Sequence, residues 1–220
     1  LITEFKVTDT QKIVIPPTYS VEITSEKNPK FRTKSKLVSL LTICRLEERK
    51  GIIPVLKCLS ELNKNNSLKP FLWNICGEGP QKKEIKEIIK GLGLSEQVKL
   101  IGRVSGDTKV DFIKKSDLFI MPSYKTKNSL EGFGISYIEA AAYGIPSIAG
   151  IDGGVLDAVT DSMTGWCVNP LSLNELSDTI MEAINNEKKR KEYGQKAKRQ
   201  FMDYFSGEKV FRKLVDTISI

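Results

Sequence analysis

The sequence predicts an α/β fold: a Rossmann-like parallel sheet with helices on both faces, followed by a helical C-terminal segment. Short apolar runs alternate with amphipathic stretches of about ten residues, and strands separated by helices of that length are typical of a parallel sheet. An apolar fraction of 40% supports a packed core, and no apolar run approaches the roughly 20 residues that span a bilayer.

The elements follow from two patterns. Residues 37–43 form an apolar run that predicts a buried strand, and residues 51–62 repeat apolar side chains every three or four positions, which predicts a helix. The later elements share these patterns. They are strands at 71–76, 98–101, 117–122, 146–149 and 166–168, and helices at 81–89, near 107–114 and at 133–143.

The two ends of the chain differ from this middle part. From Leu171 onward the pattern is helical throughout. Residues 1–35 are polar, contain Pro16-Pro17 and Pro29, and hold one predicted strand at 12–15. We therefore expect residues 1–35 to be a linker or the remnant of a preceding domain, and residues 36–220 to be a folded domain. Because the sequence lacks an initiator methionine, we expect a fragment of a longer chain.

Histidine is absent, which excludes histidine general bases, the serine triad and most zinc sites. The sequence also has no Asp-x-Asp pair to hold a divalent ion against a diphosphate, so we expect no metal. The cysteines Cys44, Cys58, Cys76 and Cys167 follow neither metal nor redox spacing and fit a reducing cytosol.

The net charge is +7, from 34 basic and 27 acidic residues. Such a surplus of positive charge favours the binding of polyanions, of an anionic membrane face or of a phosphorylated ligand. The alternative is that it only reflects a proteome rich in lysine. The densest basic run, residues 188–191, has no interleaved aromatic residues. We interpret it as a solvated helix face and expect no nucleic-acid partner.

Four segments follow predicted strands, where open parallel sheets bind their ligands. The first, residues 44–51, contains Arg45 and Lys50, which could clamp a diphosphate without metal. A surface loop with ordinary salt bridges is the alternative for this segment.

The second and third segments are glycine loops. Residues 77–80, Gly-Glu-Gly-Pro, form a tight turn, but Lys82 stands where a dinucleotide fingerprint needs another glycine. Residues 102–106 include Arg103 and Val104 and could lie against a nucleobase; a helix-capping loop explains them equally well.

The fourth segment, residues 131–146, is the most informative. Glu131 and Glu139 stand eight positions apart, with the loop Gly132-Phe133-Gly134 between them. A loop that allows close backbone approach leads into a helix whose free amides favour an anion, and carboxylates accept hydrogen bonds from hydroxyl groups. Glu139 also lies on an apolar helix face, where a carboxylate needs a partner or a ligand. This segment suggests a phosphorylated sugar as ligand.

Together these segments resemble the donor-binding domain of family-four (group 1) retaining glycosyltransferases of the GT-B architecture. The similarity covers roughly residues 37–170, in the order that the family shows. The matching residues are Arg45, Lys50-Gly51, Gly77-Glu78-Gly79-Pro80, Gly102-Arg103-Val104, Pro122-Ser123, Glu131-Gly132-Phe133-Gly134, Glu139 and Gly153-Gly154. The chain departs from the family pattern at two positions. Cys44 stands where the family usually has glycine, and Asp157 stands where glutamate is more common. Neither departure removes a proposed ligand group.

The resemblance implies a role for each matched residue. Arg45 and Lys50 would hold the donor diphosphate and stabilise the departing nucleoside diphosphate. Glu131 would accept hydrogen bonds from the transferred sugar, and Glu139 would bind the ribose diol. The remaining residues would contact the donor mainly through their backbones. They are Phe133, Gly134, Ile135, Arg103, Val104 and Gly77.

The implied function is that of the donor-binding half of a retaining hexosyltransferase. It would use a UDP- or GDP-sugar as co-substrate, without another cofactor, and transfer the sugar to a glycan or lipid-linked acceptor in polysaccharide biosynthesis. The acceptor would bind a preceding domain, so this chain alone would bind nucleotide but turn over slowly or not at all. Family analogy places the full-length enzyme in the cytoplasm, with peripheral association at the inner membrane face.

Other functions are compatible with parts of the pattern. A non-catalytic nucleotide-sugar-binding or regulatory module would retain most of the same residues. A sugar phosphorylase would need a lysine context for pyridoxal phosphate, and an epimerase would need acid and base residues that a histidine-free chain supplies poorly. A dinucleotide-dependent oxidoreductase would need the glycine that Lys82 replaces.

Overall fold

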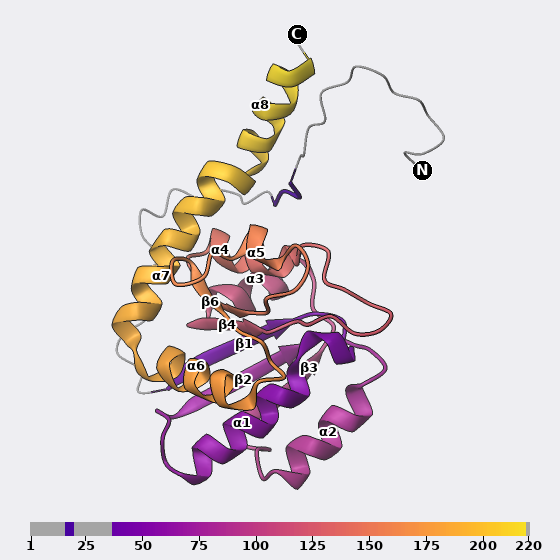
Figure 1. Cartoon of the computed structure of the whole chain (residues 1–220), viewed down its shortest axis with the longest axis vertical. Helices are drawn as coiled ribbons and strands as arrows, with labels where there is room; N and C mark the ends of the chain where they lie inside the picture. The colour runs from indigo at the N-terminus through magenta and orange to yellow at the C-terminus, as the bar shows by residue number, and fades with distance from the viewer. Residues whose placement is uncertain (1–15, 20–36, 219–220) are drawn as a thin grey trace.

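A computed structural model describes residues 16–19 and 37–218 (Figure 1). Its six-stranded sheet has the order β3-β2-β1-β4-β5-β6, and every neighbouring pair is parallel. The strands are β1 (Val38–Ile43), β2 (Phe71–Cys76), β3 (Val98–Gly102), β4 (Leu118–Met121), β5 (Ser147–Ala149) and β6 (Gly165–Cys167). These strands confirm the predicted fold class.

The helices expected from the 3.6-residue pattern are also present. They are α1 (Ile52–Lys64), α2 (Lys82–Gly91), α3 (Gly106–Lys114), α4 (Ile135–Ala142), α6 (Leu173–Asn185), α7 (Glu187–Gln200) and α8 (Gly207–Ile218). Two short elements were not predicted, the 3-10 helix η1 (Glu48–Lys50) and α5 (Val155–Ala158). The π-helix η2 (Phe201–Phe205) lies within the segment expected to be helical from Leu171 onward. The predicted strand at 12–15 and the boundary at 35/36 lie outside the described residues, so the division into two parts stays a prediction.

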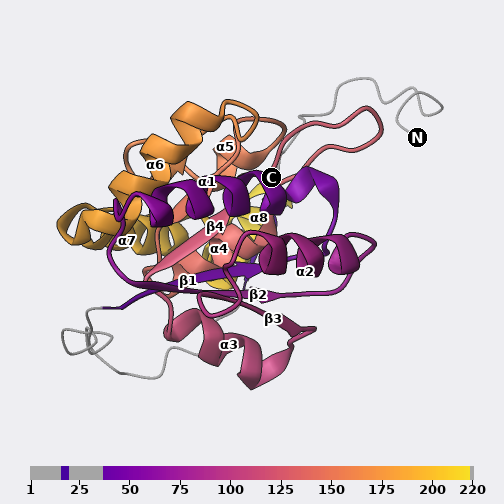
Figure 2. The same cartoon turned by 90° about the horizontal axis from the view of Figure 1, so that it is seen from below.

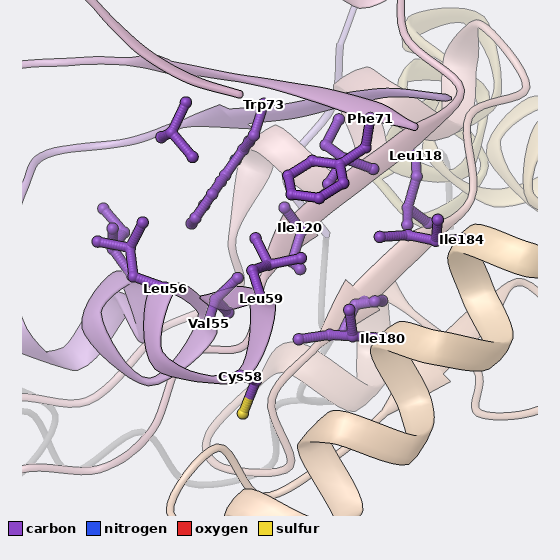
Figure 3. Packing of buried hydrophobic residues seen from close by; sticks show 14 of the residues in the cluster. Val55, Leu56, Cys58, Leu59, Phe71, Trp73, Leu118, Ile120, Ile180 and Ile184 are labelled. Atoms are coloured by element: carbon purple, nitrogen blue, oxygen red, sulfur yellow. The ribbon is translucent and has the colours of Figure 1, made fainter. Parts of the chain in front are cut away.

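Helices cover both faces of the sheet (Figure 2), and each face has its own apolar core. Successive side chains of β1 point to opposite faces, so Leu40 joins the core under α1, α2 and α6, while Leu41 joins the core under α4 and α5. In the first core, Trp73 and Phe71 of β2 lie over α1, with Ile180 and Ile184 of α6 closing the side (Figure 3). Burying such side chains contributes roughly 1.5–3 kcal/mol each, which fixes the helices against the sheet.

The strand order creates a switch point between β1 and β4. The chain runs outward from β1 to β2 and β3, then returns to the other side of β1 as β4 and continues to β5 and β6. Loops after β1 and β4 therefore leave the same edge of the sheet in opposite directions and open a crevice between them. Two predicted binding segments, 44–51 and 131–135, follow these two strands.

Helix α7 connects the two cores at the β6 side of the sheet, with Tyr193 in the first core and Ala197 in the second. The interpretation of residues 188–191 as a solvated face is wrong for Arg190. This side chain is buried, and its Nη1 donates to the carbonyl oxygens of Ala183 at 2.6 Å and Ile184 at 2.5 Å. It satisfies carbonyls that the end of α6 leaves open.

Within residues 16–19 and 37–218, no helix combines the length and the apolar character needed to cross a membrane.

Candidate functional site

The loops at the carboxyl ends of β1, β2 and β3 are tied together by backbone hydrogen bonds. Leu46 N–H donates to the Glu78 carbonyl at 2.8 Å, and Gly77 N–H donates to the Gly102 carbonyl at 2.7 Å. A Cβ on Gly77 would stand 1.8 Å from the Cys44 carbonyl oxygen, so only glycine fits there. The structure thus gives Gly77 a packing role that aligns three loops; its contact with a ligand stays a prediction.

Lys50 and Glu131 meet in the crevice between β1 and β4. The 3-10 turn η1 and Gly51, whose φ is 71°, turn the chain into α1 and direct Lys50 inward, where it is buried. Its Nζ donates to Oε2 of Glu131, and Nη1 of Arg49 donates to the same oxygen at 2.7 Å. One carboxylate oxygen is therefore held by two cations from the loop after β1.

Arg45 lies at the outer end of the same loop. Its Nε contacts Oε1 of Glu47 at 2.8 Å, with 72% of the arginine side chain accessible. Glu47 also accepts from Nε of Arg49 at 3.2 Å, so an alternating chain of charges runs from Arg45 to Lys50. The structure does not bring Arg45 to Glu131, and its role toward a diphosphate stays a prediction.

Arg49 is the residue of this loop that the sequence argument missed. It stands directly before Lys50, but the family motif matched only Arg45 and Lys50 in this loop. Only the fold shows that the side chain reaches Glu131, 82 positions away.

The loop that carries Glu131 rests on the glycine pair after β5. Gly154 N–H donates to the Glu131 carbonyl at 3.2 Å, and a Cβ on Gly153 would stand 2.1 Å from the same oxygen. Gly134, with a φ of 82°, then begins α4, and no side chain caps this helix. Within the described chain, the amides of Phe133, Gly134 and Ile135 donate no hydrogen bond. They remain able to bind an anion at a helix N-terminus.

Two hydroxyl groups fix α4 against the strands beside the crevice. Ser136 Oγ donates to the Ile43 carbonyl at 2.9 Å, which ties the first turn of α4 to the end of β1. The phenol of Tyr137 donates to the Met121 carbonyl at the end of β4 and lies 3.2 Å from Ser123 Oγ. Burial raises the pKa of Tyr137, so this group stays a neutral donor.

The second glutamate lies one helical turn further along α4 and faces α3. Glu139 is buried, and its Oε1 accepts from Nζ of Lys109 at 2.5 Å. The sequence argument expected a partner or a ligand for Glu139 but did not identify Lys109, because the contact joins two helices separated by β4.

The predicted nucleobase loop lies beside α3. Arg103 is exposed, while Val104 is partly buried against the second core. Cys44, at the end of β1, is partly buried as well, and burial raises the pKa of its thiol to about 12. It is therefore an uncharged group next to the cations of the loop. Among residues 16–19 and 37–218, no group of three or more cysteine, aspartate or glutamate residues is arranged to hold a metal ion.

Comparison with known proteins agrees with this geometry. The family model of glycosyl transferases group 1 matches residues 23–200. An uncharacterised glycosyltransferase of Methanocaldococcus jannaschii is 33% identical over 152 residues, which cover 68% of this chain and 41% of that protein. A GDP-mannose-dependent monoacylated alpha-(1-6)-phosphatidylinositol monomannoside mannosyltransferase of Corynebacterium glutamicum is 30% identical over 152 residues. The match covers 68% of this chain and 39% of that protein.

The fold has close counterparts among solved structures. The Anabaena protein HepE, solved in complex with UDP and glucose, superposes with a TM-score of 0.70 at 21% identity and covers 84% of this chain and 48% of that one. This likeness confirms the Rossmann-like fold of a GT-B half.

The chain therefore belongs to the family of group 1 glycosyl transferases, as the motifs in its sequence indicated. It spans about two fifths of the length of the two curated relatives named above.

Proposed function

We propose that this chain is the donor-binding half of a retaining glycosyltransferase that uses a UDP- or GDP-sugar. One observation carries the proposal: Lys50 and Arg49 meet Glu131 at the sheet's switch point, beside the uncapped N-terminus of α4. Relatives support it, since one is named as GDP-mannose-dependent and a protein of the same fold binds UDP and glucose.

The donor diphosphate fits between Lys50 and the free amides of residues 133–135. A diphosphate needs positive charge and backbone donors, and this crevice offers both without requiring a metal. Arg45, at the mouth of the same loop, turns from Glu47 to the phosphates when they bind. As the glycosidic bond breaks, negative charge develops on the leaving diphosphate, and the nearby cations lower the energy of that state.

Glu131 has the right geometry to bind the transferred sugar. Its Oε2 is held by two cations, while its Oε1 accepts no hydrogen bond within the described chain and is not sealed from solvent. A fixed carboxylate with one open oxygen can accept from a sugar hydroxyl and orient the ring against the diphosphate.

The acceptor, in this proposal, binds to a preceding domain, as the length of the curated relatives suggests. A lipid-linked or glycan acceptor fits the relative that is named for a phosphatidylinositol monomannoside, and would bring the full-length enzyme to the inner membrane face from the cytoplasm. Turnover then requires both domains, so the full-length protein distinguishes an enzyme from a module that only binds nucleotide sugars.

The direct test is a thermal-shift panel of UDP, GDP, ADP, the matching monophosphates and the sugar-linked diphosphates, with and without magnesium. Ligand at 100 times its Kd stabilises the folded state by about 2.7 kcal/mol, which raises Tm by several degrees. We expect one diphosphate to raise Tm well above its monophosphate, with no need for magnesium. If no nucleotide shifts Tm at millimolar concentration, the proposal is wrong.

A further inference from the structure

A lysine on α3 holds the second glutamate of the site. Lys109 Nζ donates to Oε1 of Glu139 at 2.5 Å and so links α3 to α4. Only 25% of the lysine side chain and 7% of the glutamate side chain are accessible. A shielded ion pair adds little net stability, because the lost hydration offsets the attraction, but it does fix the positions of the two groups relative to one another.

The position of Lys109 on its own helix supports this view. It ends the first turn of α3, whose N-terminus carries partial positive charge and favours acidic residues such as Asp107. Neither the helix dipole nor packing in the core favours a lysine at this position. Glu139 explains it, because a carboxylate among Ile138, Ala140 and Ala141 needs a counter-charge.

The pair leaves one carboxylate oxygen available. Oε2 of Glu139 accepts no hydrogen bond within the described chain and is not sealed from solvent. Because the ammonium group of Lys109 holds Oε1, the Glu139 carboxylate has a fixed orientation. Its Oε2 can therefore accept a hydrogen bond from a ligand without a change of side-chain conformation.

We propose that Lys109 is a positioning residue for nucleotide recognition: it fixes Glu139 so that Oε2 accepts a hydrogen bond from the ribose diol. This inference rests on the proposed function, and it adds a residue that no family motif in this sequence contains.

The proposal predicts a selective defect. Without Lys109, the Glu139 carboxylate loses the contact that orients it, so recognition of the diol weakens. Recognition of the phosphates continues in this proposal, because Lys50 and Arg45 bind them from a different loop, after β1. A purely structural role would instead weaken binding of every ligand alike.

The experiment compares each nucleoside diphosphate with its 2′,3′-dideoxy form by calorimetry, using the wild-type chain and variants. We expect the wild-type chain to prefer the ribose form by roughly tenfold or more, the range of a charged hydrogen bond. Lys109→Met and Lys109→Gln lose most of this preference, and Lys109→Arg recovers part of it. In a Glu139→Gln background, Lys109→Met has no further effect on the preference.

Lys115→Met is the matched control, because Lys115 follows the same helix and forms an exposed pair with Asp111 at 3.6 Å. It keeps the wild-type preference. If the wild type prefers the diol and both Lys109 variants keep that preference, the positioning role is wrong while the proposed function stands. If the wild-type chain binds no nucleoside diphosphate, the proposed function fails and this inference fails with it.

Discussion

Glu131 and Glu139 are the residues on which the site depends, and each is held by basic side chains from an element distant in sequence. Glu131 accepts from Lys50 and Arg49 after β1, and Glu139 accepts from Lys109 on α3. In both cases one oxygen is held, and the other accepts no hydrogen bond within the described residues. Two oriented acceptors on one short segment suit the sugar and the ribose of one donor molecule.

Replacing Glu139 tests the ribose contact. Glu139→Ala removes a charged acceptor, so we expect nucleotide binding to weaken by about 1.5–3 kcal/mol. Isothermal calorimetry measures the change, with Glu87→Ala on the exposed side of α2 as the control. Unchanged affinity would remove Glu139 from the site.

Gly153 tests the support under Glu131. Its φ of 71° strains any side chain, and a Cβ would stand 2.1 Å from the Glu131 carbonyl oxygen. We expect Gly153→Ala to lower the free energy of unfolding by about 2 kcal/mol or more. Gly91→Ala is the control, because a Cβ at this position at the end of α2 meets no atom within 4 Å. Equal urea midpoints for the two variants would show that the close approach of Gly153 to the Glu131 carbonyl oxygen is not needed for stability.

Among the elements, α6 and α7 depend on one another through Arg190. The arginine crosses from α7 to the last carbonyls of α6, and Asn186 between them accepts from Lys189 N–H at 3.0 Å as the cap of α7. The arginine side chain is buried, and this burial lowers the pKa of Arg190 because it removes the charge from water. The corner between the helices is thus held by polar contacts as well as by packing.

We expect Arg190→Met to cost about 2–4 kcal/mol of folding free energy, because it leaves two buried carbonyl groups without a donor. Lys191→Met, which breaks an exposed pair with Glu187, changes stability by less than about 0.5 kcal/mol. Urea unfolding of both variants compares the two effects. A similar small loss for both would mean that water replaces the arginine.

Periodicity located the helices of eight residues or more, but it could not detect elements too short to repeat. Helix α5 has four residues and η1 has three, so neither shows a pattern. The run at 188–191 illustrates a second limit. Its composition favoured a solvated face, whereas Arg190 is buried because a long side chain reaches the open end of another helix.

At the scale of the whole molecule, the site depends on strand order. Lys50 and Glu131 are 81 positions apart and meet only because β4 lies beside β1. The alternation of strands and helices predicts a parallel sheet but does not give this order, which only the structure shows. The partners Arg49 and Lys109 lie outside the family motifs, and only three-dimensional packing identifies them.

The most direct test of the account concerns the diphosphate. Calorimetry compares a nucleoside diphosphate with the free nucleoside on the wild-type chain, on Lys50→Ala, and on Lys57→Ala as the exposed control from α1. Glu131 keeps Arg49 as a partner in Lys50→Ala, so the loop should stay folded. We predict that Lys50→Ala reduces the preference for the diphosphate by roughly tenfold or more, while Lys57→Ala retains it. A Lys50→Ala chain that still prefers the diphosphate as strongly as the wild type would contradict the account.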